Sequence, residues 1–188
     1  MKTVLLLVAS LLVATNWVFA DEEPNFDDSK VLDKILREAV GWEGLEERGP
    51  DEEKLSYQVG EQTPYTGWWK MIHDNGQVST LVYYKDGKQE GLCPAWHDNG
   101  QMKMESTFKD GKQEGPVTWW RENGQKEQEA TYKDGQPEGL WTMWYENGQK
   151  EQETTYQDGK LEGLATKWNE EGKVVERIHY KDGVTVKE

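Results

Sequence analysis

The feature that most constrains this chain is a pattern that repeats every 24 residues, without insertion, from Gly67 to Gly183. An opening glycine recurs as Gly67, Gly91, Gly115, Gly139 and Gly163. An Asn-Gly pair recurs from Asn75-Gly76 to Asn147-Gly148 and becomes Glu171-Gly172 in the last unit. An Asp-Gly pair recurs in every unit, from Asp86-Gly87 to Asp182-Gly183. A fixed period in this range is typical of a repeat array made of one small supersecondary unit.

Each unit contains two turn signals separated by short runs rich in Trp, Tyr, Thr and Val. Asn-Gly and Asp-Gly are strong hairpin signals, because these residues tolerate the positive φ that tight turns need. The fold class predicted from this pattern is all-β. We expect an elongated single-layer antiparallel meander of about five hairpin repeats and about ten strands.

The aromatic residues of each unit fall into two columns. With the opening glycine counted as zero, step five carries Trp96, Trp120, Trp144 and Trp168. Step seventeen carries Tyr84, Phe108, Tyr132, Tyr156 and Tyr180. Both steps are odd, and they share a face if the loop between the strands has an odd number of residues. We therefore predict three-residue loops with a glycine bulge, and one face on which both columns form the structural core.

The even steps of the first strands provide the candidate binding residues, which are Trp69, Met71, Trp119, Trp141 and Met143. We expect these side chains to be rimmed by two columns from the second strands, Thr107, Thr131 and Thr155 with Glu105, Glu129 and Glu153. Large apolar residues exposed on an open sheet are typical of an interaction surface. The alternative, which the sequence leaves open, is that sheet curvature or an N-terminal helix buries them.

The unit Gly-x-Trp-x-x-Trp-Tyr-Glu-Asn-Gly-Gln-Lys, continued by x-x-Glu-x-x-Tyr-Lys-Asp-Gly-Lys-x-Glu-Gly, resembles the MORN-repeat variant of many bacterial proteins. Some of those proteins are labelled as antitoxins of the YwqK type. The lead-in segment 57–67 also resembles the opening of that family, so the resemblance covers residues 55–188. It implies an elongated one-layer sheet that acts as a scaffold, and an antitoxin-like role as one function of such a scaffold.

Residues 1–20 have the features of a secretion signal. One cation, Lys2, precedes the apolar run Val4–Ala14, and Val18-Phe19-Ala20 provides a cleavage point after Ala20. An uncleaved anchor is the alternative, although the apolar run is short for a bilayer span of about 20 residues. We expect a secreted or periplasmic protein.

Residues 21–54 are acidic and precede the repeat domain, which we place at residues 55–188. Asp28 or Ser29 is expected to cap a helix that runs to about Val40. Its apolar stripe is Val31, Leu32, Ile35, Leu36 and Ala39. This helix either caps the first repeat or binds a partner, and capping is favoured because terminal repeats must cover an open core end. We interpret Trp42–Lys54 as a linker and Leu55–Gly60 as a degenerate strand.

The formal net charge of −14 makes binding to nucleic acid or to an anionic membrane unfavourable, since both are negatively charged. Cleavage of the signal would remove one further cation, Lys2.

No catalytic arrangement is visible in the sequence, so we expect no enzyme activity, no cofactor and no metal site. His73 and His97 precede hairpin turns at a step where other units have Arg121 and Tyr145, which favours a role in solvating the turn. The single cysteine, Cys93, excludes an internal disulfide and is interpreted as a small apolar filler.

The leading functional hypothesis is a non-catalytic scaffold that binds another protein through the repeat face. Carbohydrate or cell-wall binding is an alternative, because aromatic rows on a flat sheet are suited to stacking sugar rings. A purely structural spacer is a second alternative.

Overall fold

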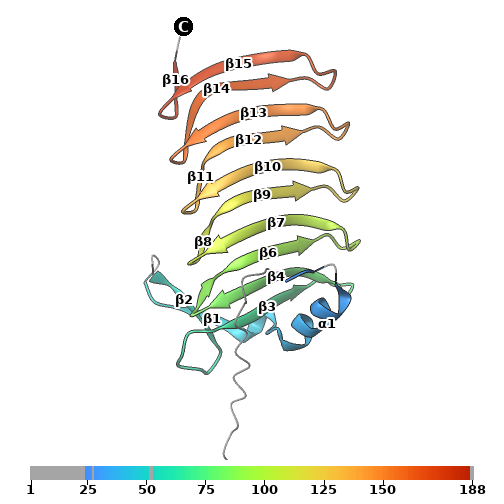
Figure 1. Cartoon of the computed structure of the whole chain (residues 1–188), viewed down its shortest axis with the longest axis vertical. Coiled ribbons are helices and arrows are strands. Elements are labelled where there is room, and N and C mark those ends of the chain that lie inside the picture. The colour runs from blue at the N-terminus through green and yellow to red at the C-terminus, as the bar shows by residue number, and fades with distance from the viewer. Residues whose placement is uncertain (1–23, 27, 51–52, 187–188) are drawn as a thin grey trace, which may run out of the picture.

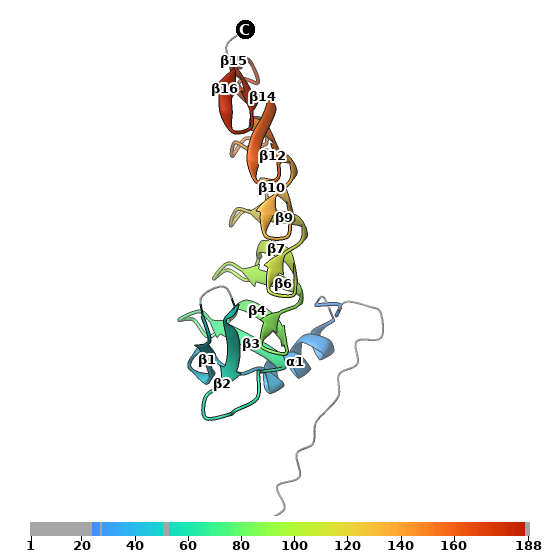
Figure 2. The same ribbon diagram turned by 90° about the vertical axis from the view of Figure 1, so that its left-hand side faces the viewer.

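The computed structural model describes residues 24–26, 28–50 and 53–186. The repeats form a 14-stranded antiparallel sheet in which hairpins are stacked in chain order from β3 to β16 (Figure 1). Seen along its edge, the repeat region is one layer thick (Figure 2). The predicted all-β, elongated, single-layer meander of hairpin repeats is confirmed.

Each unit contains two main strands and, in most units, a short third one. The first strands are β3 (Gly67–Ile72), β6 (Gly91–Trp96), β9 (Gly115–Trp120), β12 (Gly139–Trp144) and β14 (Lys160–Trp168). The second strands are β4 (Val78–Lys85), β7 (Met102–Lys109), β10 (Lys126–Lys133), β13 (Lys150–Gln157) and β15 (Val174–Lys181). The short strands are β5 (Lys88–Gln89), β8 (Lys112–Gln113), β11 (Gln136–Pro137) and β16 (Val184–Val186).

The two turns of a unit differ in length. At the Asn-Gly turn, the His97 N–H donates to the Gln101 carbonyl at 2.8 Å, which leaves the three loop residues 98–100. Gly100 has a φ of 82°, so the predicted three-residue loop with a left-handed glycine is confirmed here. At the Asp-Gly turn, Lys109 pairs with Lys112 and only two residues form the loop. Asp110 and Gly111 have φ values of 51° and 82°, which identifies a mirror-image type I′ turn, so the three-residue prediction is wrong there.

A bulge in the second strand overturns the predicted arrangement of the faces. Trp120 pairs with Lys126, but the next pair is Trp119 with Gln128, so Glu127 is an extra residue. The same shift occurs in the other hairpins that start a unit. Beyond the bulge odd steps pair with even steps, and Tyr132 lies opposite Gly115. The prediction that the Trp and Tyr columns share one face is therefore wrong.

Because directly paired residues share a face and neighbouring residues alternate, the register defines two faces. The helix face carries Trp68, Leu81, Tyr83, Trp96, Trp120, Trp144 and Trp168. The tyrosine face carries Tyr84, Phe108, Tyr132, Tyr156 and Tyr180, together with Trp69, Met71, Trp119, Trp141 and Met143.

The helix α1 (Ser29–Glu38) packs on the helix face of the first unit. The Asp28 side chain accepts a hydrogen bond from the Lys30 N–H at 2.9 Å, so the predicted N-cap is confirmed. Ile35 and Ala39 form a buried core with three residues of the sheet, Trp68, Leu81 and Tyr83. Phe26 adds edge-on contacts to Trp68 and Trp96, with ring centroids 5.8 and 6.3 Å apart. The helix caps the array, as the sequence favoured.

The described part of the segment between α1 and the repeats has secondary structure, where we predicted a linker. It contains the 3-10 helix η1 (Trp42–Gly44) and the strand β1 (Leu45–Arg48), which pairs with β2 (Leu55–Gln58) in a separate two-stranded sheet. The Arg48 guanidinium lies 4.6 Å from the centre of the Tyr57 ring, a cross-strand contact that favours the hairpin. Figure 2 shows α1 and the β1–β2 hairpin on opposite sides of the main sheet. The predicted signal segment 1–20 lies outside the described residues.

Candidate binding face

The tyrosine face carries an aromatic column along the whole array. Each second strand places one aromatic residue opposite the opening glycine of its unit, because every unit has the same length and the same register. Burial raises the pKa of Tyr132, and the neighbouring Tyr156 raises it further. Both effects favour the neutral phenol of Tyr132.

Trp141 is the centre of the densest aromatic contact on this face. Its ring stacks on Trp119 with centroids 6.2 Å apart and planes at 22°. It also lies between Tyr132 and Tyr156, at 6.0 and 5.5 Å. Such pairs each contribute about 0.5 to 1.5 kcal/mol beyond the burial of their area. Both tryptophans are half-buried, so part of each residue remains exposed to solvent.

The five predicted binding residues do lie on one face of the sheet. Trp69, Trp119, Trp141 and Met143 are half-buried, and Met71 is 43% exposed. Among the described elements, α1 lies on the other side of the sheet and β1–β2 lies beside the first unit (Figure 2). The predicted helix therefore does not cover these residues.

The predicted rim of Thr and Glu does not belong to this face. Glu129 pairs with Thr142, and both lie on the helix face with Trp120 and Trp144. The cause is again the bulge, which moves the second-strand residues to the opposite side. On the helix face, Lys126 forms an ion pair with Glu129 at 2.9 Å, and Lys150 forms the equivalent pair with Glu153.

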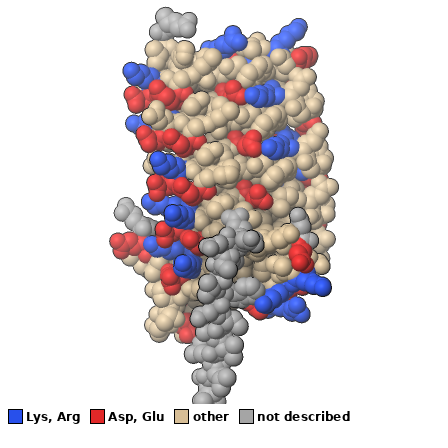
Figure 3. All heavy atoms as spheres, viewed as in Figure 1, with Lys and Arg blue, Asp and Glu red and all other residues tan. Residues whose placement is uncertain are grey.

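The helix face past α1 is a second exposed surface. Leu140 and Leu164 are 51% and 45% exposed there. Figure 3 shows this side of the molecule, with charged side chains concentrated along the edge where the Asp-Gly turns lie. Its exposed leucines are separated by Thr residues, and its aromatic residues are the column Trp96, Trp120, Trp144 and Trp168.

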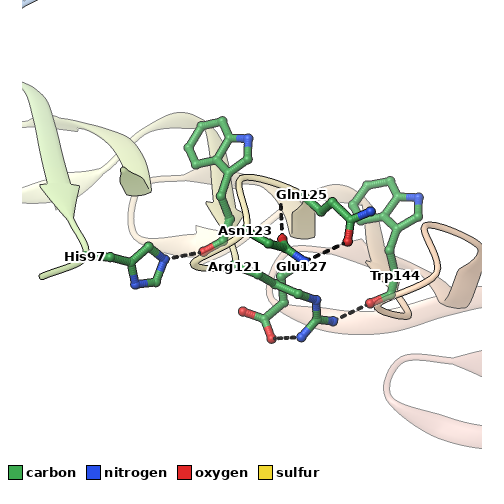
Figure 4. Close-up of polar contacts among 7 residues, drawn as sticks. His97, Arg121, Asn123, Gln125, Glu127 and Trp144 are labelled. Carbon is green, nitrogen blue, oxygen red and sulfur yellow. Dashed lines mark hydrogen bonds and ion pairs between the residues drawn. The ribbon is translucent and has the colours of Figure 1, made fainter. Parts of the chain in front are cut away.

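The edge with the Asn-Gly turns is held by side chains that bond to the next unit. Each donates to the carbonyl of the following unit's Trp (Figure 4). The bonds are His73 to Trp96 at 2.9 Å, His97 to Trp120 at 2.8 Å, Arg121 to Trp144 at 2.6 Å and Tyr145 to Trp168 at 2.9 Å. His, Arg and Tyr share one property here, a long side chain that ends in a donor. The sequence did not reveal this role, because the three residue types look unrelated.

The opposite edge uses a second row of contacts between units. The Asp110 and Asp134 N–H groups donate to the carboxylates of Glu90 and Glu114, each at 2.9 Å. Thr66 plays the same part at the start of the array, accepting from the Asp86 N–H at 2.9 Å. The recurrent Glu before each opening glycine therefore caps the following turn.

The residues with reactive side chains have structural surroundings. Cys93 is buried, and burial raises the pKa of its thiol to about 11, which keeps it protonated and weakly nucleophilic at neutral pH. Within residues 24–26, 28–50 and 53–186, no group of three His, Cys, Asp or Glu side chains is arranged to hold a metal ion. No helix in this described part of the chain is long and apolar enough to cross a bilayer.

Residues 89–110, 113–134, 137–158 and 161–182 each match the family model described as the MORN repeat variant. The chain carries four tandem MORN repeat variants. MORN repeats are generally non-catalytic modules that bind proteins or membranes. The first hairpin, β3–β4, lies outside the matched MORN segments but has the same register and the same bulge as the units that follow.

The comparison with curated proteins found no match. Among solved structures, a chain titled "Crystal structure of GtfA/B complex bound to UDP and GlcNAc" is similar over 72% of this chain and 24% of that chain. The identity is 8% and the TM-score 0.23, so this likeness carries no functional argument.

Proposed function

We propose that this protein is a non-catalytic, extracytoplasmic scaffold that binds another protein along its tyrosine face. The observation that carries the proposal is the cluster of stacked and tilted aromatic rings around Trp141, half-exposed on a sheet that is one layer thick. Tyr and Trp are the residue types that most often supply binding energy at protein interfaces.

The charge of the chain favours a protein over an anionic membrane as the partner. A net charge of −14 repels acidic lipid headgroups and attracts partners with basic surfaces. The extracytoplasmic location rests on the signal-like composition of residues 1–20. Mass spectrometry of the mature protein tests it, and a chain that still begins at Met1 in the cytoplasm would refute it.

Two strands each carry one tryptophan on either face of the sheet, which provides a matched test of the binding face. Trp119→Ala and Trp141→Ala remove rings from the tyrosine face, whereas Trp120→Ala and Trp144→Ala remove the same rings from the helix face. Capture of the partner from the native compartment should fall by tenfold or more only for the first pair. Thermal unfolding of all four variants controls for loss of structure. Equal effects of the two pairs would show that the tyrosine face is not the site.

Carbohydrate binding is the competing function, because a row of flat rings is also suited to sugar stacking. Retention of the protein on insoluble polysaccharide or peptidoglycan, lost in Trp141→Ala, would favour it over protein binding.

An antitoxin-like role is a special case of the proposed scaffold and rests on the resemblance to YwqK-type proteins. Co-expression with the neighbouring gene product tests it. If that product is toxic alone and harmless with this chain, the role is supported; a harmless neighbour would remove it.

A further inference from the structure

The tyrosine face has a gap in its last unit. Two residues after its opening glycine, the fourth unit has Trp141 and the fifth has Ala165. Trp141 pairs with Thr154 and lies between Tyr132 and Tyr156. Ala165 pairs with Ile178 at the equivalent place, on the strand between those that carry Tyr156 and Tyr180. The fifth unit therefore keeps both tyrosines and lacks the indole between them.

A hollow of about 180 Å³ is found at this place. Tyr156 and Tyr180 line it, together with Ala165, Ile178 and Thr154. An apolar cavity of about 150 Å³ is large enough to bind a benzene molecule. The hollow is therefore large enough for one aromatic group and too small for the drug-sized ligands that occupy typical pockets.

Polar and charged side chains line the same hollow. Lys167 and Glu176 lie directly opposite each other on β14 and β15, and both line the hollow. Lys167 stands where the other units have Met71, Ala95, Trp119 and Met143, so the cation is specific to this unit. An ammonium group near an aromatic face is attracted to the ring, and a carboxylate is an acceptor for an indole N–H.

We propose that this hollow binds the indole side chain of a tryptophan on the partner protein, which takes the place that Trp141 fills in the preceding unit. The inference deepens the proposed function and rests on it, since it names the group that the partner inserts. The partner's tryptophan lies in a basic segment, because the acidic chain favours cationic neighbours.

Methyl NMR on the full-length protein tests the proposal, with Ala165 and Ile178 as reporters inside the hollow. The probe is a short peptide with one tryptophan between lysines, and the control peptide has leucine in place of tryptophan. The tryptophan peptide should shift both methyl signals in a saturable way, and the leucine peptide should leave them unchanged. Unchanged signals with both peptides, or shifts caused only by an oligomer of N-acetylglucosamine, would overturn the proposal.

Ala165→Trp should fill the hollow with the chain's own indole. We expect it to weaken binding of the tryptophan peptide by at least tenfold, read from the Ile178 methyl signal, and to raise the thermal midpoint. If this variant does not fold, Tyr180→Leu removes one wall of the hollow and should weaken binding in the same assay. Peptide binding that survives the substitution would refute the site.

The two proposals fail in different ways. If Trp141→Ala abolishes capture of the partner and Ala165→Trp leaves it unchanged, the hollow is not used and the binding face stands. If the tryptophan peptide binds at Ala165 but both Trp119→Ala and Trp141→Ala capture the partner as well as the unchanged protein does, the hollow stands as a site and the aromatic cluster around Trp141 is not part of the binding surface. Dimerisation that disappears in Ala165→Trp would identify a second copy as the occupant and overturn the proposal of a different partner protein.

Discussion

The first and last units of the array have the same backbone but opposite surroundings. In the first unit, Trp68, Leu81 and Tyr83 are 6%, 0% and 8% exposed beneath α1. The residues at the same steps of the last unit are Leu164, which is 45% exposed, and the exposed Arg177 and His179. Both hairpins have the same bulge and the same left-handed Asp-Gly turn. The turns and the contacts between units therefore determine the backbone of the hairpin. The residue types on each face differ according to whether another element covers that face.

The largest effect that would sharpen this comparison is the loss of a buried leucine at the capped end. Leu81→Ala should lower the free energy of unfolding by about 2 to 5 kcal/mol, because it opens a cavity beneath α1. Leu140→Ala, at a site that is 51% exposed, should change it by less than about 0.5 kcal/mol. Chemical denaturation measures both. Equal losses of unfolding free energy in the two variants would mean that packing of α1 on the first unit does not stabilise the protein.

Two glycines at equivalent turns should respond differently to alanine. Gly87 and Gly135 have φ values of 79° and 81°, so alanine costs about 1 to 2 kcal/mol at either site. At Gly87 the new Cβ would also meet Leu55 Cβ at 2.9 Å and the Ser56 carbonyl at 3.0 Å, whereas at Gly135 its nearest neighbour is Lys112 Cβ at 3.8 Å. Thermal unfolding should therefore show a larger loss for Gly87→Ala. A larger loss for Gly135→Ala would contradict the packing of β2 against the first turn.

The edge contacts predict a smaller, local effect at the open end. Tyr145→Phe removes the hydroxyl that donates to the Trp168 carbonyl at 2.9 Å and should cost about 0.5 to 1.5 kcal/mol. Because each unit touches only its neighbours, the faster amide hydrogen exchange should be confined to β14 and β15. Uniform acceleration along the array would show that the units open together.

The smallest effect at neutral pH concerns Tyr65 at the capped end. Burial raises the pKa of Tyr65 from 10.0 to about 12. Below pH 10 the phenol is neutral in both states; between about pH 10 and 12 only the unfolded chain loses the proton, so stability falls as the pH rises. Tyr65→Phe should make this fall shallower, although it also removes a hydrogen bond to the Trp68 carbonyl. Denaturation curves at a series of alkaline pH values measure the free energy of unfolding of both proteins. An equal fall with pH in the two proteins would refute the raised pKa of Tyr65.

The sequence was sufficient for the fold class, the hairpin units, the N-cap at Asp28 and the grouping of Trp119 with Trp141 on one face. It was insufficient for the relation between the two strands of a unit. The bulge at Glu127 and its equivalents carries no glycine or other sequence signal, yet it transfers every second-strand residue to the other face. The hollow at Ala165 was missed for the same reason, since its walls come from the tyrosine column that the parity argument had placed on the far side.

The direction of the hydrogen bonds has a mechanical consequence. The strands lie across the long axis of the molecule, so the bonds between them run along that axis (Figure 1). Tension applied between the two ends would load these bonds one after another and peel the hairpins apart, instead of shearing whole strands together. A force-extension trace should then show weak, evenly spaced steps. Each released unit of 24 residues would add about 80 Å of extended chain.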